Sequence, residues 1–193
     1  MSEAKTRLLE TASRLFYAEG LHAVGIDRVV AEAQVTRATL YRHFPSKDDL
    51  LVAYLTQADE AIRARAAEAQ SSGADADDVI RTIAESIADD IGSPGFRGCA
   101  FLNAAAEYPD PKHPVHKAVL AHRQWFLKTM TGLFATTGKT DAEPAARHFV
   151  MLRDGAMAAG CLADPKPICA TFLRGVEGLL TYRSGLESDA DLS

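Results

Sequence analysis

The sequence predicts an all-α protein. Apolar residues recur at three- and four-residue spacing, segments with this spacing are separated by Gly and Pro, and the alternation typical of β-strands is nearly absent. We expect about nine helices. Residues 1–50 are predicted to form a small three-helix domain, and residues 51–193 a C-terminal antiparallel helix bundle. The chain of 193 residues is long enough for one large domain or two small ones.

Two apolar stripes predict the first two helices. The first contains Leu8, Leu9, Ala12, Leu15 and Phe16, and Gly20 is placed to end that helix. The second is shorter and contains Ile26, Val29, Val30 and Ala33. Only a tight connection at residues 34–35 separates it from the next segment. Two short helices joined by such a turn, each with an apolar inner face, predict a helix-turn-helix.

The third helix is predicted from its cap and its anchor. Thr36 is a good N-cap, and Val35 and Leu40 are spaced as a hydrophobic staple. Leu40 and Phe44 lie one turn apart and are expected to hold the helix to the core. Pro45 ends it, and Ser46 is a good N-cap for the next helix. The outward face would then carry Ala38, Thr39, Tyr41 and Arg42.

Six further helices complete the expected order. The predicted segments are Ser46 to about Gln70, a stripe from Val79 to Ile91, residues 96–108, residues 115–138, a helix from the Thr140–Glu143 capping pair to Leu162, and a last helix containing Phe172 to Leu180 before Gly185.

The charge is distributed unevenly along the chain. The formal net charge is −5, yet residues 1–50 contain seven Lys or Arg and seven Asp or Glu, so this part is neutral. Within it, residues 33–47 contain Arg37, Arg42 and Lys47 and no acid. A local cationic face on an otherwise acidic chain indicates binding of a polyanion in one orientation.

The sequence also indicates the cellular location of the protein and the state of its cysteines. There is no basic-then-apolar leader, and the longest apolar run, Ala156 to Ala163, is too short to span a bilayer, so a cytoplasmic protein without membrane contact is expected. Cys99, Cys161 and Cys169 form no C-x-x-C motif. They are expected to be buried thiols; a redox sensor is the alternative and needs two of them within bonding distance.

Metal and enzyme chemistry are weakly supported. His113 and His116, with Asp110 and His122 nearby, are an isolated His-x-x-His pattern interrupted by prolines, and Glu-x-x-His occurs once, at residues 19–22. No nucleophile is paired with a base at a recognisable spacing, and no phosphate-binding loop is present. We therefore expect no cofactor, no metal and no enzyme activity.

Residues 25–47 closely resemble the DNA-binding segment of TetR-family (tetracycline-repressor-like) transcriptional regulators. The resemblance rests on the run Thr39-Leu40-Tyr41-x-His43-Phe44-x-Ser46-Lys47, and it extends over residues 5–55. It implies a recognition helix in the major groove. One departure concerns the tight turn, where the family usually has Gly and this chain has Gln34. Gln34 must adopt a strained left-handed conformation or a right-handed variant of the turn.

The resemblance implies roles for individual side chains. Arg37 and Thr39 would approach base edges, and Arg37 is the best candidate to read guanine. Tyr41, His43 and Lys47 would contact phosphates, while Arg28 would reach the opposite phosphate row. The complete predicted DNA-binding set is Arg28, Thr36, Arg37, Ala38, Thr39, Tyr41, Arg42, His43 and Lys47.

The same resemblance implies an effector cavity and a dimer interface in the C-terminal part. Aromatic and Met side chains there are expected in the core unless polar groups among them orient a ligand. The predicted pocket set is Phe101, Asn103, Glu107, His122, Trp125, Phe126, Met130, His148, Met151 and Asp154. Small residues that let two helices approach closely favour the last two helices as the dimer interface, with the predicted set Gly155, Ala159, Phe172, Val176 and Leu179.

The expected protein is a homodimeric, ligand-responsive regulator that binds operator DNA and is released from it by a small-molecule effector. In this family such regulators are most often repressors. Two alternatives remain: an enzyme built on a helical bundle, and an effector-free architectural or adaptor dimer with the same DNA-binding part.

Overall fold

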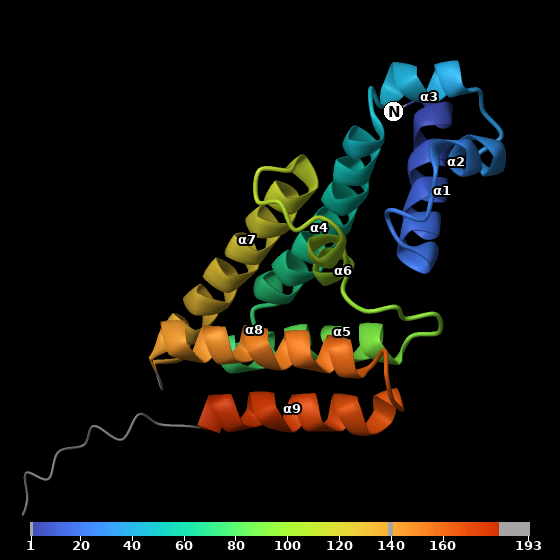
Figure 1. The fold of residues 1–193 in the computed structure, drawn as a ribbon. Coiled ribbons are helices and arrows are strands. Elements are labelled where there is room, and N and C mark those ends of the chain that lie inside the picture. Colours follow the sequence, from blue (N-terminus) through green and yellow to red (C-terminus); the bar gives the residue numbers. More distant parts are fainter. Residues whose placement is uncertain (1, 139–140, 182–193) are drawn as a thin grey trace, which may run out of the picture. The chain divides into compact units, whose positions relative to one another are not determined.

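A computed structural model describes residues 2–138 and 141–181, and this part of the chain forms nine α-helices and no strand (Figure 1). Their bounds are α1 Glu3–Glu19, α2 Ile26–Glu32, α3 Arg37–His43, α4 Lys47–Ser71, α5 Ala76–Gly92, α6 Ala100–Glu107, α7 Pro114–Thr137, α8 Ala142–Ala159 and α9 Pro165–Thr181. The predicted all-α class is confirmed.

The helices divide into two compact units. The first unit contains Met1–Arg65 and Pro94–Gln124, and the second contains Ala66–Ser93 and Trp125–Ser193. The long helices α4 and α7 each contribute residues to both. This division follows packing; the functional boundary predicted after residue 50 remains a prediction.

In the first unit, α1, α2 and α3 pack against one another around a small apolar core. Leu8 and Leu15 of α1, Val29 of α2 and Leu40 of α3 are all buried in it. Each comes from a stripe that the sequence spacing indicates. Since α2 and α3 have only seven residues each, they depend on this packing for stability, because isolated helices of that length do not form in water.

The turn between α2 and α3 contains Gln34, at the position where the family usually has Gly. Gln34 has φ +52°, so it adopts the left-handed conformation. The amide of Gln34 donates to the carbonyl of Ala31 at 3.3 Å, and that of Val35 donates to the carbonyl of Val30 at 3.1 Å. These two bonds form a Schellman motif, which normally has Gly at the left-handed position. The turn therefore keeps the usual geometry and accepts strain at Gln34.

Polar contacts tie α1 and the loop after it to the segment around α6. The hydroxyl of Tyr17 donates to the carbonyl of Gly98 at 3.0 Å and accepts from the amide of Arg97 at 2.9 Å. The Glu107 carboxylate accepts from the amides of Leu21 and His22 at 2.9 and 2.6 Å. The first unit is thus joined across more than 80 residues of sequence by hydrogen bonds.

Histidines and aromatic rings extend these links. The ring of Tyr108 lies 4.5 Å from the ring of His22 and 4.5 Å from that of His113. His113 Nε2 is 3.2 Å from a carboxylate oxygen of Asp48 in α4. The α1–α2 loop, the end of α6 and the starts of α4 and α7 therefore meet around Tyr108, whose pKa is raised mainly by burial.

In the second unit, α5, α8 and α9 pack together (Figure 1), and aromatic side chains occupy their core. Phe149 of α8 is fully buried, and its ring lies 6.0–6.4 Å from those of Phe126, Phe134 and Phe172. Rings at these separations and tilts attract one another in addition to burying apolar area.

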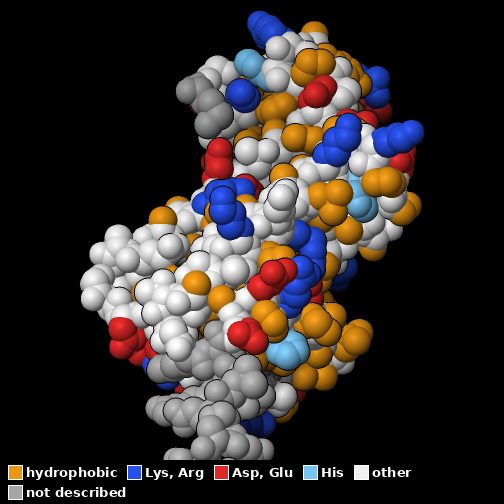
Figure 2. All heavy atoms as spheres, turned by 90° about the vertical axis from the view of Figure 1, so that its left-hand side faces the viewer, with side chains coloured by type: hydrophobic (Ala, Val, Ile, Leu, Met, Phe, Trp, Pro, Cys, Tyr) orange, Lys and Arg blue, Asp and Glu red, His pale blue; other side chains and the backbone are white. Residues whose placement is uncertain are grey.

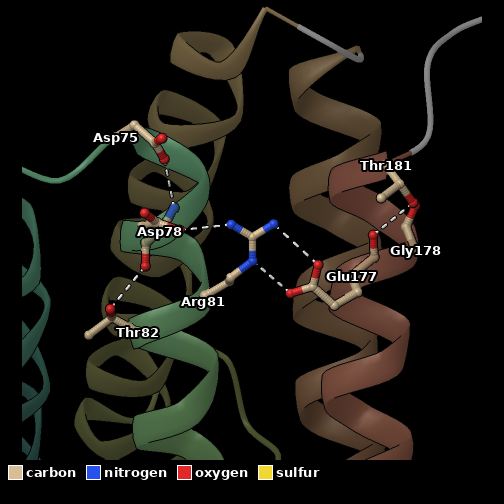
Figure 3. Close-up of polar contacts among 7 residues, drawn as sticks. All are labelled: Asp75, Asp78, Arg81, Thr82, Glu177, Gly178 and Thr181. Atoms are coloured by element: carbon tan, nitrogen blue, oxygen red, sulfur yellow. Dashed lines mark hydrogen bonds and ion pairs between the residues drawn. The ribbon is translucent and has the colours of Figure 1, made fainter.

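An ion pair at the surface links α5 to α9 in the same unit. Figure 3 shows Arg81 of α5 reaching toward Glu177 of α9, with donor–acceptor distances of 2.7 and 3.2 Å, while it also contacts Asp78 at 2.8 Å. These carboxylates raise the pKa of Arg81. Asp75 caps the same end of α5 by accepting from the amide of Asp78.

Several helix ends differ from the predictions. The helix expected at residues 96–108 covers only Ala100–Glu107, and α8 ends at Ala159, before Leu162. Asp141 rather than Thr140 is the N-cap of α8; Thr140 lies outside the described residues, as does Gly185. Pro165 is the first residue of α9, where a missing N–H costs nothing. No helix in the described part is long and apolar enough to cross a membrane.

Candidate nucleic-acid interface

Helix α3 is held by one face, as the sequence predicts. Thr36 is its N-cap, and the Thr36 hydroxyl accepts from the amide of Thr39 at 3.1 Å. Leu40 and Phe44 are buried. The cap fixes where the helix begins and the two apolar side chains fix its rotation, so the opposite face is presented outward.

The outward face carries cations, hydroxyls and little bulk. Arg37, Ala38, Tyr41 and Arg42 are exposed, and Thr39 is half-buried. Tyr41 is one of the few large apolar side chains exposed in the described residues. Figure 2 shows Lys, Arg and His side chains among hydrophobic ones at the end of the first unit that carries α3. The geometry suits a surface that approaches a polyanion closely.

The start of α4 continues this face. The Ser46 hydroxyl accepts from the amide of Asp49 at 3.1 Å, which confirms Ser46 as a capping residue. Lys47 is half-buried, and its ammonium lies 3.5 Å from the carbonyl of His22. Partial burial is the main cause that lowers the pKa of Lys47. A phosphate beside it would favour its charged form.

The N-terminal end of α1 lies beside the end of α3, a proximity that sequence reasoning missed. Ser2, the N-cap of α1, lies 3.2 Å from Nε2 of His43. The ammonium of Lys5 lies 5.7 Å from the ring centre of Phe44, a cation–π contact. No local pattern connects residues 2–5 with residues 43–44, so only the packing of α1 on α3 reveals this proximity.

Arg28 sits among carboxylates. Its guanidinium donates to Glu32 at 3.1 Å and to Glu19 at 3.4 Å, and Arg14 pairs with the same Glu32. The hydrogen bond from Arg14 is the main reason that the pKa of Glu32 is lowered. Arg28 is therefore part of a surface ion-pair network, which weakens its predicted role as a phosphate contact.

Arg37 is also paired, but in a different way. Its Nε and Nη2 donate to the two carboxylate oxygens of Asp27, each at 2.6 Å. This pairing is the main cause that raises the pKa of Arg37. Both side chains remain mostly exposed, at 59% for Arg37 and 76% for Asp27. The pair links the first turn of α2 to the first residue of α3.

The histidines of the two candidate metal motifs each have a different hydrogen-bond partner. His113 Nδ1 accepts from the amide of Val115 at 3.3 Å, whereas His116 Nδ1 lies 2.7 Å from the carbonyl of Tyr108. His22 Nε2 lies 2.8 Å from the carbonyl of Glu107. Within the described residues, no group of three or more His, Cys, Asp or Glu side chains is placed to hold a metal ion.

The predicted effector-pocket residues differ in burial. Phe101, His122, Phe126 and Met130 are buried. In the first unit His122 stacks on Phe101 with ring centres 3.6 Å apart, and its Nδ1 lies 2.7 Å from Asp59. Two buried aromatic systems and one carboxylate thus meet within a single unit.

In the second unit, the buried guanidinium of Arg153 lies 5.3 Å from the ring centre of Phe126 and donates to Asp154 at 2.9 Å. Trp125 and Asp154 are half-buried. These side chains therefore carry their polar groups beside a buried aromatic surface.

Four pocket predictions need correction. Asn103 is exposed and donates to the carbonyl of Arg97 at 2.9 Å, and the Glu107 carboxylate binds the amides of Leu21 and His22. Their polar groups already have structural partners. His148 and Met151 are exposed on α8 and lie outside the core formed by the described residues. Sequence spacing places a residue on a helix face but does not say which face another helix covers.

Two dimer-interface predictions also need correction. Phe172 and Val176 are 2% and 1% exposed in the single chain, so they belong to its own core and offer no surface to a partner. Gly155 is exposed, and Ala159 and Leu179 are partly exposed.

All three cysteines are thiols; Cys99 is buried, but Cys161 is exposed and Cys169 half-buried, which corrects the expectation that all are buried. Burial is the main cause that raises the pKa of Cys169.

A capped short helix that is anchored on one side and cationic on the other, following a tight turn from another short helix, defines a DNA-binding protein of the helix-turn-helix class. The model of the family described as bacterial regulatory proteins, tetR family, matches residues 8–54. The solved TetR-family regulator SCO4454 of Streptomyces coelicolor is 67% identical, with a TM-score of 0.90 over 93% of this chain and 95% of its own. The chain therefore belongs to the TetR family of transcriptional regulators.

Other relatives are similar over less of the chain or in fold alone. The transcriptional activator FasR of Mycolicibacterium smegmatis is 42% identical over 53 residues, which are 28% of this chain and only 24% of FasR. A transcriptional regulator of Saccharomonospora viridis, solved in complex with choline, is 21% identical with a TM-score of 0.77 over 93% of this chain and 96% of its own. This last likeness shows the fold alone.

Proposed function

We propose that the protein is a homodimeric regulator that binds a near-palindromic operator and releases it when a small-molecule effector binds the C-terminal part. The observation that carries the proposal is the exposed face of α3, where Arg37, Tyr41 and Arg42 stand out beside Ala38. Low bulk at Ala38 lets a groove wall approach, and the cations meet phosphates and base edges. Such a protein acts on chromosomal DNA in the bacterial cytoplasm.

In this proposal residues 1–50 supply the DNA contacts. Arg37 and Thr39 lie at the start of α3, where recognition helices contact base edges. Tyr41, His43 and Lys47 lie farther along the same face and contact phosphates, with Ser2 and Lys5 next to His43. Arg42 contributes charge without a carboxylate within ion-pair distance among the described residues.

The surface of α8 supports dimer formation. Met151 of α8 is 69% exposed, and exposed Gly155 and Ala158 follow it at helical spacing. Leu162, just beyond the end of α8, is 87% exposed. Figure 2 shows hydrophobic side chains gathered beside a His side chain at the level of this helix. Exposed apolar side chains next to small residues favour close packing of a second copy. With Ala159 and Leu179, they form the proposed interface.

The effector is proposed to bind residues 51–193 and to change the spacing of the two recognition helices. A coupling free energy of about 1–3 kcal/mol lowers operator affinity about 5- to 150-fold. Each unit has its own candidate for a ligand-orienting group beside a buried ring: His122 with Asp59 in the first unit, and, separately, Arg153 with Asp154 in the second. The choline complex of a protein with the same fold makes choline a reasonable first probe.

Selection of genomic DNA fragments on the purified protein, followed by sequencing, tests the DNA-binding part of the proposal. We expect enrichment of a near-palindrome whose half-site centres are about one helical turn or somewhat more apart. The double variant Arg37→Ala/Tyr41→Ala should lose this enrichment and keep its helical circular dichroism. Arg147→Ala, which removes an exposed cation from α8, is the matched control and should retain it. Absence of any enriched sequence would contradict the proposal.

A second experiment tests the effector and the direction of regulation. The enriched fragment is placed before a reporter gene, and candidate small molecules, choline first, are screened for thermal stabilisation of the protein, since a ligand that binds only the folded state raises its stability. A repressor lowers reporter output until the ligand is added; an activator, as FasR is named, raises it. A bound ligand that leaves operator affinity unchanged would overturn the release mechanism.

A further inference from the structure

The first residue of α3 is oriented by a carboxylate of the preceding helix. Asp27 accepts two hydrogen bonds from Arg37, one from Nε and one from Nη2, both at 2.6 Å. The carboxylate and the guanidinium therefore lie side on, the arrangement in which two parallel bonds fix the plane of both groups. Arg37 is otherwise a long, exposed side chain with many rotamers of similar energy.

The side-on contact leaves the end of the guanidinium available. A guanidinium has five N–H donors, and Asp27 takes one from Nε and one from Nη2. Both donors of Nη1 and the second donor of Nη2 remain. One N–H of Nη1 and the second N–H of Nη2 point along the end of the group, and their spacing matches O6 and N7 of guanine in the major groove. Arg37 can therefore bind Asp27 and guanine at the same time.

The pair is not needed to hold α2 against α3. The turn between them is already closed by the Schellman hydrogen bonds at Gln34 and Val35, and Val29 and Leu40 are fully buried between the helices. An ion pair exposed as fully as Asp27–Arg37 contributes little to stability, because water screens it. A carboxylate on a face that approaches phosphates is also unfavourable for affinity.

Arg42 provides the contrast one turn later. It is also exposed, and its guanidinium makes a long hydrogen bond, 3.4 Å from Nη2 to the hydroxyl of Thr39. Among the described residues no carboxylate forms an ion pair with it. Asp27 thus fixes the plane of Arg37, whereas no acid of the described chain fixes that of Arg42. This difference favours a base-reading role for Arg37 and a phosphate-binding role for Arg42.

We infer that Asp27 is a positioning residue for sequence recognition: it orients Arg37 so that the free end of the guanidinium meets a guanine in each operator half-site. This inference rests on the proposed function. Asp27 contacts no DNA in this arrangement. It sets the rotamer of Arg37 before binding, so Arg37 loses less conformational entropy when the complex forms. It also opposes reorientation of Arg37 toward a phosphate on other sequences.

The test measures base preference rather than affinity alone. Operators identified by selection are synthesised with each of the four base pairs at every half-site position and titrated with the wild type, Arg37→Ala, Asp27→Asn and Asp27→Glu. We expect the wild type to prefer G·C at one position about 5- to 150-fold, the range of a good bidentate contact. Arg37→Ala should lose that preference and leave the preferences at other positions in place.

Asp27→Asn should keep binding to the preferred operator within a few-fold, and its preference for G·C should fall about 2- to 10-fold, which corresponds to the ordering of one long side chain. Asp27→Glu, which keeps the carboxylate, should restore part of the preference. In an Arg37→Ala background, Asp27→Asn should change the preference no further. Glu19→Gln removes a nearby negative charge at Arg28 and should alter affinity equally for all four base pairs.

Two results would overturn the inference while leaving the proposed function intact. One is an Asp27→Asn variant that binds all four sequences more tightly by the same factor, because Asp27 would then only repel phosphates. The other is a loss of preference that persists without Arg37. If the wild type selects no sequence at all, the proposed function itself fails. Thermal unfolding of each variant confirms that it folds.

Discussion

The two units join their distant segments by different chemistry. In the first unit, α1 and its following loop are tied to the α6 segment by hydrogen bonds from Tyr17 and to Glu107. In the second, α8 is tied to its neighbours by the ring of Phe149, and the hydrogen bonds between the distant residues Arg81 and Glu177 lie at the surface. Hydrogen bonds depend steeply on direction, whereas apolar contact does not. The unit that must present α3 at a fixed angle is thus the one held by directional contacts.

The largest expected effect comes from the aromatic cluster. Phe149→Ala removes a fully buried ring from the middle of the second unit, and we expect the free energy of unfolding to fall by about 3–5 kcal/mol. Urea unfolding followed by circular dichroism measures this loss. Glu85→Ala, which changes an exposed residue of α5 in the same unit, should cost under about 0.5 kcal/mol. Similar losses for the two variants would show that apolar packing does not hold this unit.

Glu107 tests the polar links of the first unit. Glu107→Ala leaves the amides of Leu21 and His22 without their acceptor, and we expect a cost of about 1–3 kcal/mol. Hydrogen exchange of those two amides is the direct measurement and should accelerate in the variant. Glu107→Gln keeps one oxygen acceptor and should have an intermediate effect. Unchanged exchange in Glu107→Ala would mean that the loop is held by other contacts, and the comparison between the units would fail.

Gln34 gives a smaller effect of the opposite sign. Its left-handed backbone costs an L-residue about 1–2 kcal/mol, and glycine avoids that cost but loses more backbone entropy on folding. We expect Gln34→Gly to raise the free energy of unfolding by about 0.5–1 kcal/mol. Ala31→Gly, on the exposed side of α2 with helical geometry, should lower it by about 1 kcal/mol. A loss of stability in Gln34→Gly would indicate that the Gln34 side chain makes a compensating contact.

The smallest effect is a pH dependence confined to the first unit. Because Arg14 and Arg28 lower the pKa of Glu32 below its usual value of 4.5, the folded state binds this proton less tightly than the unfolded chain does. Glu32 therefore contributes stability above about pH 4.5 that is lost as the pH falls through its lowered pKa.

Urea midpoints of wild type and Glu32→Gln measure this contribution, and their difference should be present at pH 6 and shrink below about pH 4.5. Glu10→Gln, on the exposed side of α1, is the matched control. A difference that stays constant across this range would show that the Arg14–Glu32 pair does not form in solution.

What the sequence predicts well is local. The Thr36 cap, the buried Leu40 and Phe44 and the Ser46 cap depend on residues within one turn of one another, and all are confirmed. The left-handed turn at Gln34 was one of two alternatives, and the Schellman bonds identify which applies. Strong local signals sufficed for the fold class and for the face that α3 presents.

Contacts between distant segments were beyond sequence reasoning. Asp27 is ten residues from Arg37, and the pair depends on the angle between α2 and α3, which no spacing specifies. The apolar stripe at Phe172 and Val176 was visible, but a stripe does not say whether α5, α8 or a second subunit covers it. In the same way, the type of residue at Glu107 gave no sign that it binds amides 85–86 positions earlier.

The Asp27–Arg37 pair has an evolutionary consequence. If Asp27 orients Arg37 toward guanine as proposed, a lineage that replaces Arg37 alone leaves a carboxylate facing phosphates without its partner. One that replaces Asp27 alone weakens the reading of the old operator. Either single step carries a penalty, so the two codons are expected to change together or in quick succession. Related regulators that share both residues should accordingly share a guanine at the same place in their operators, even where the rest of the site has drifted.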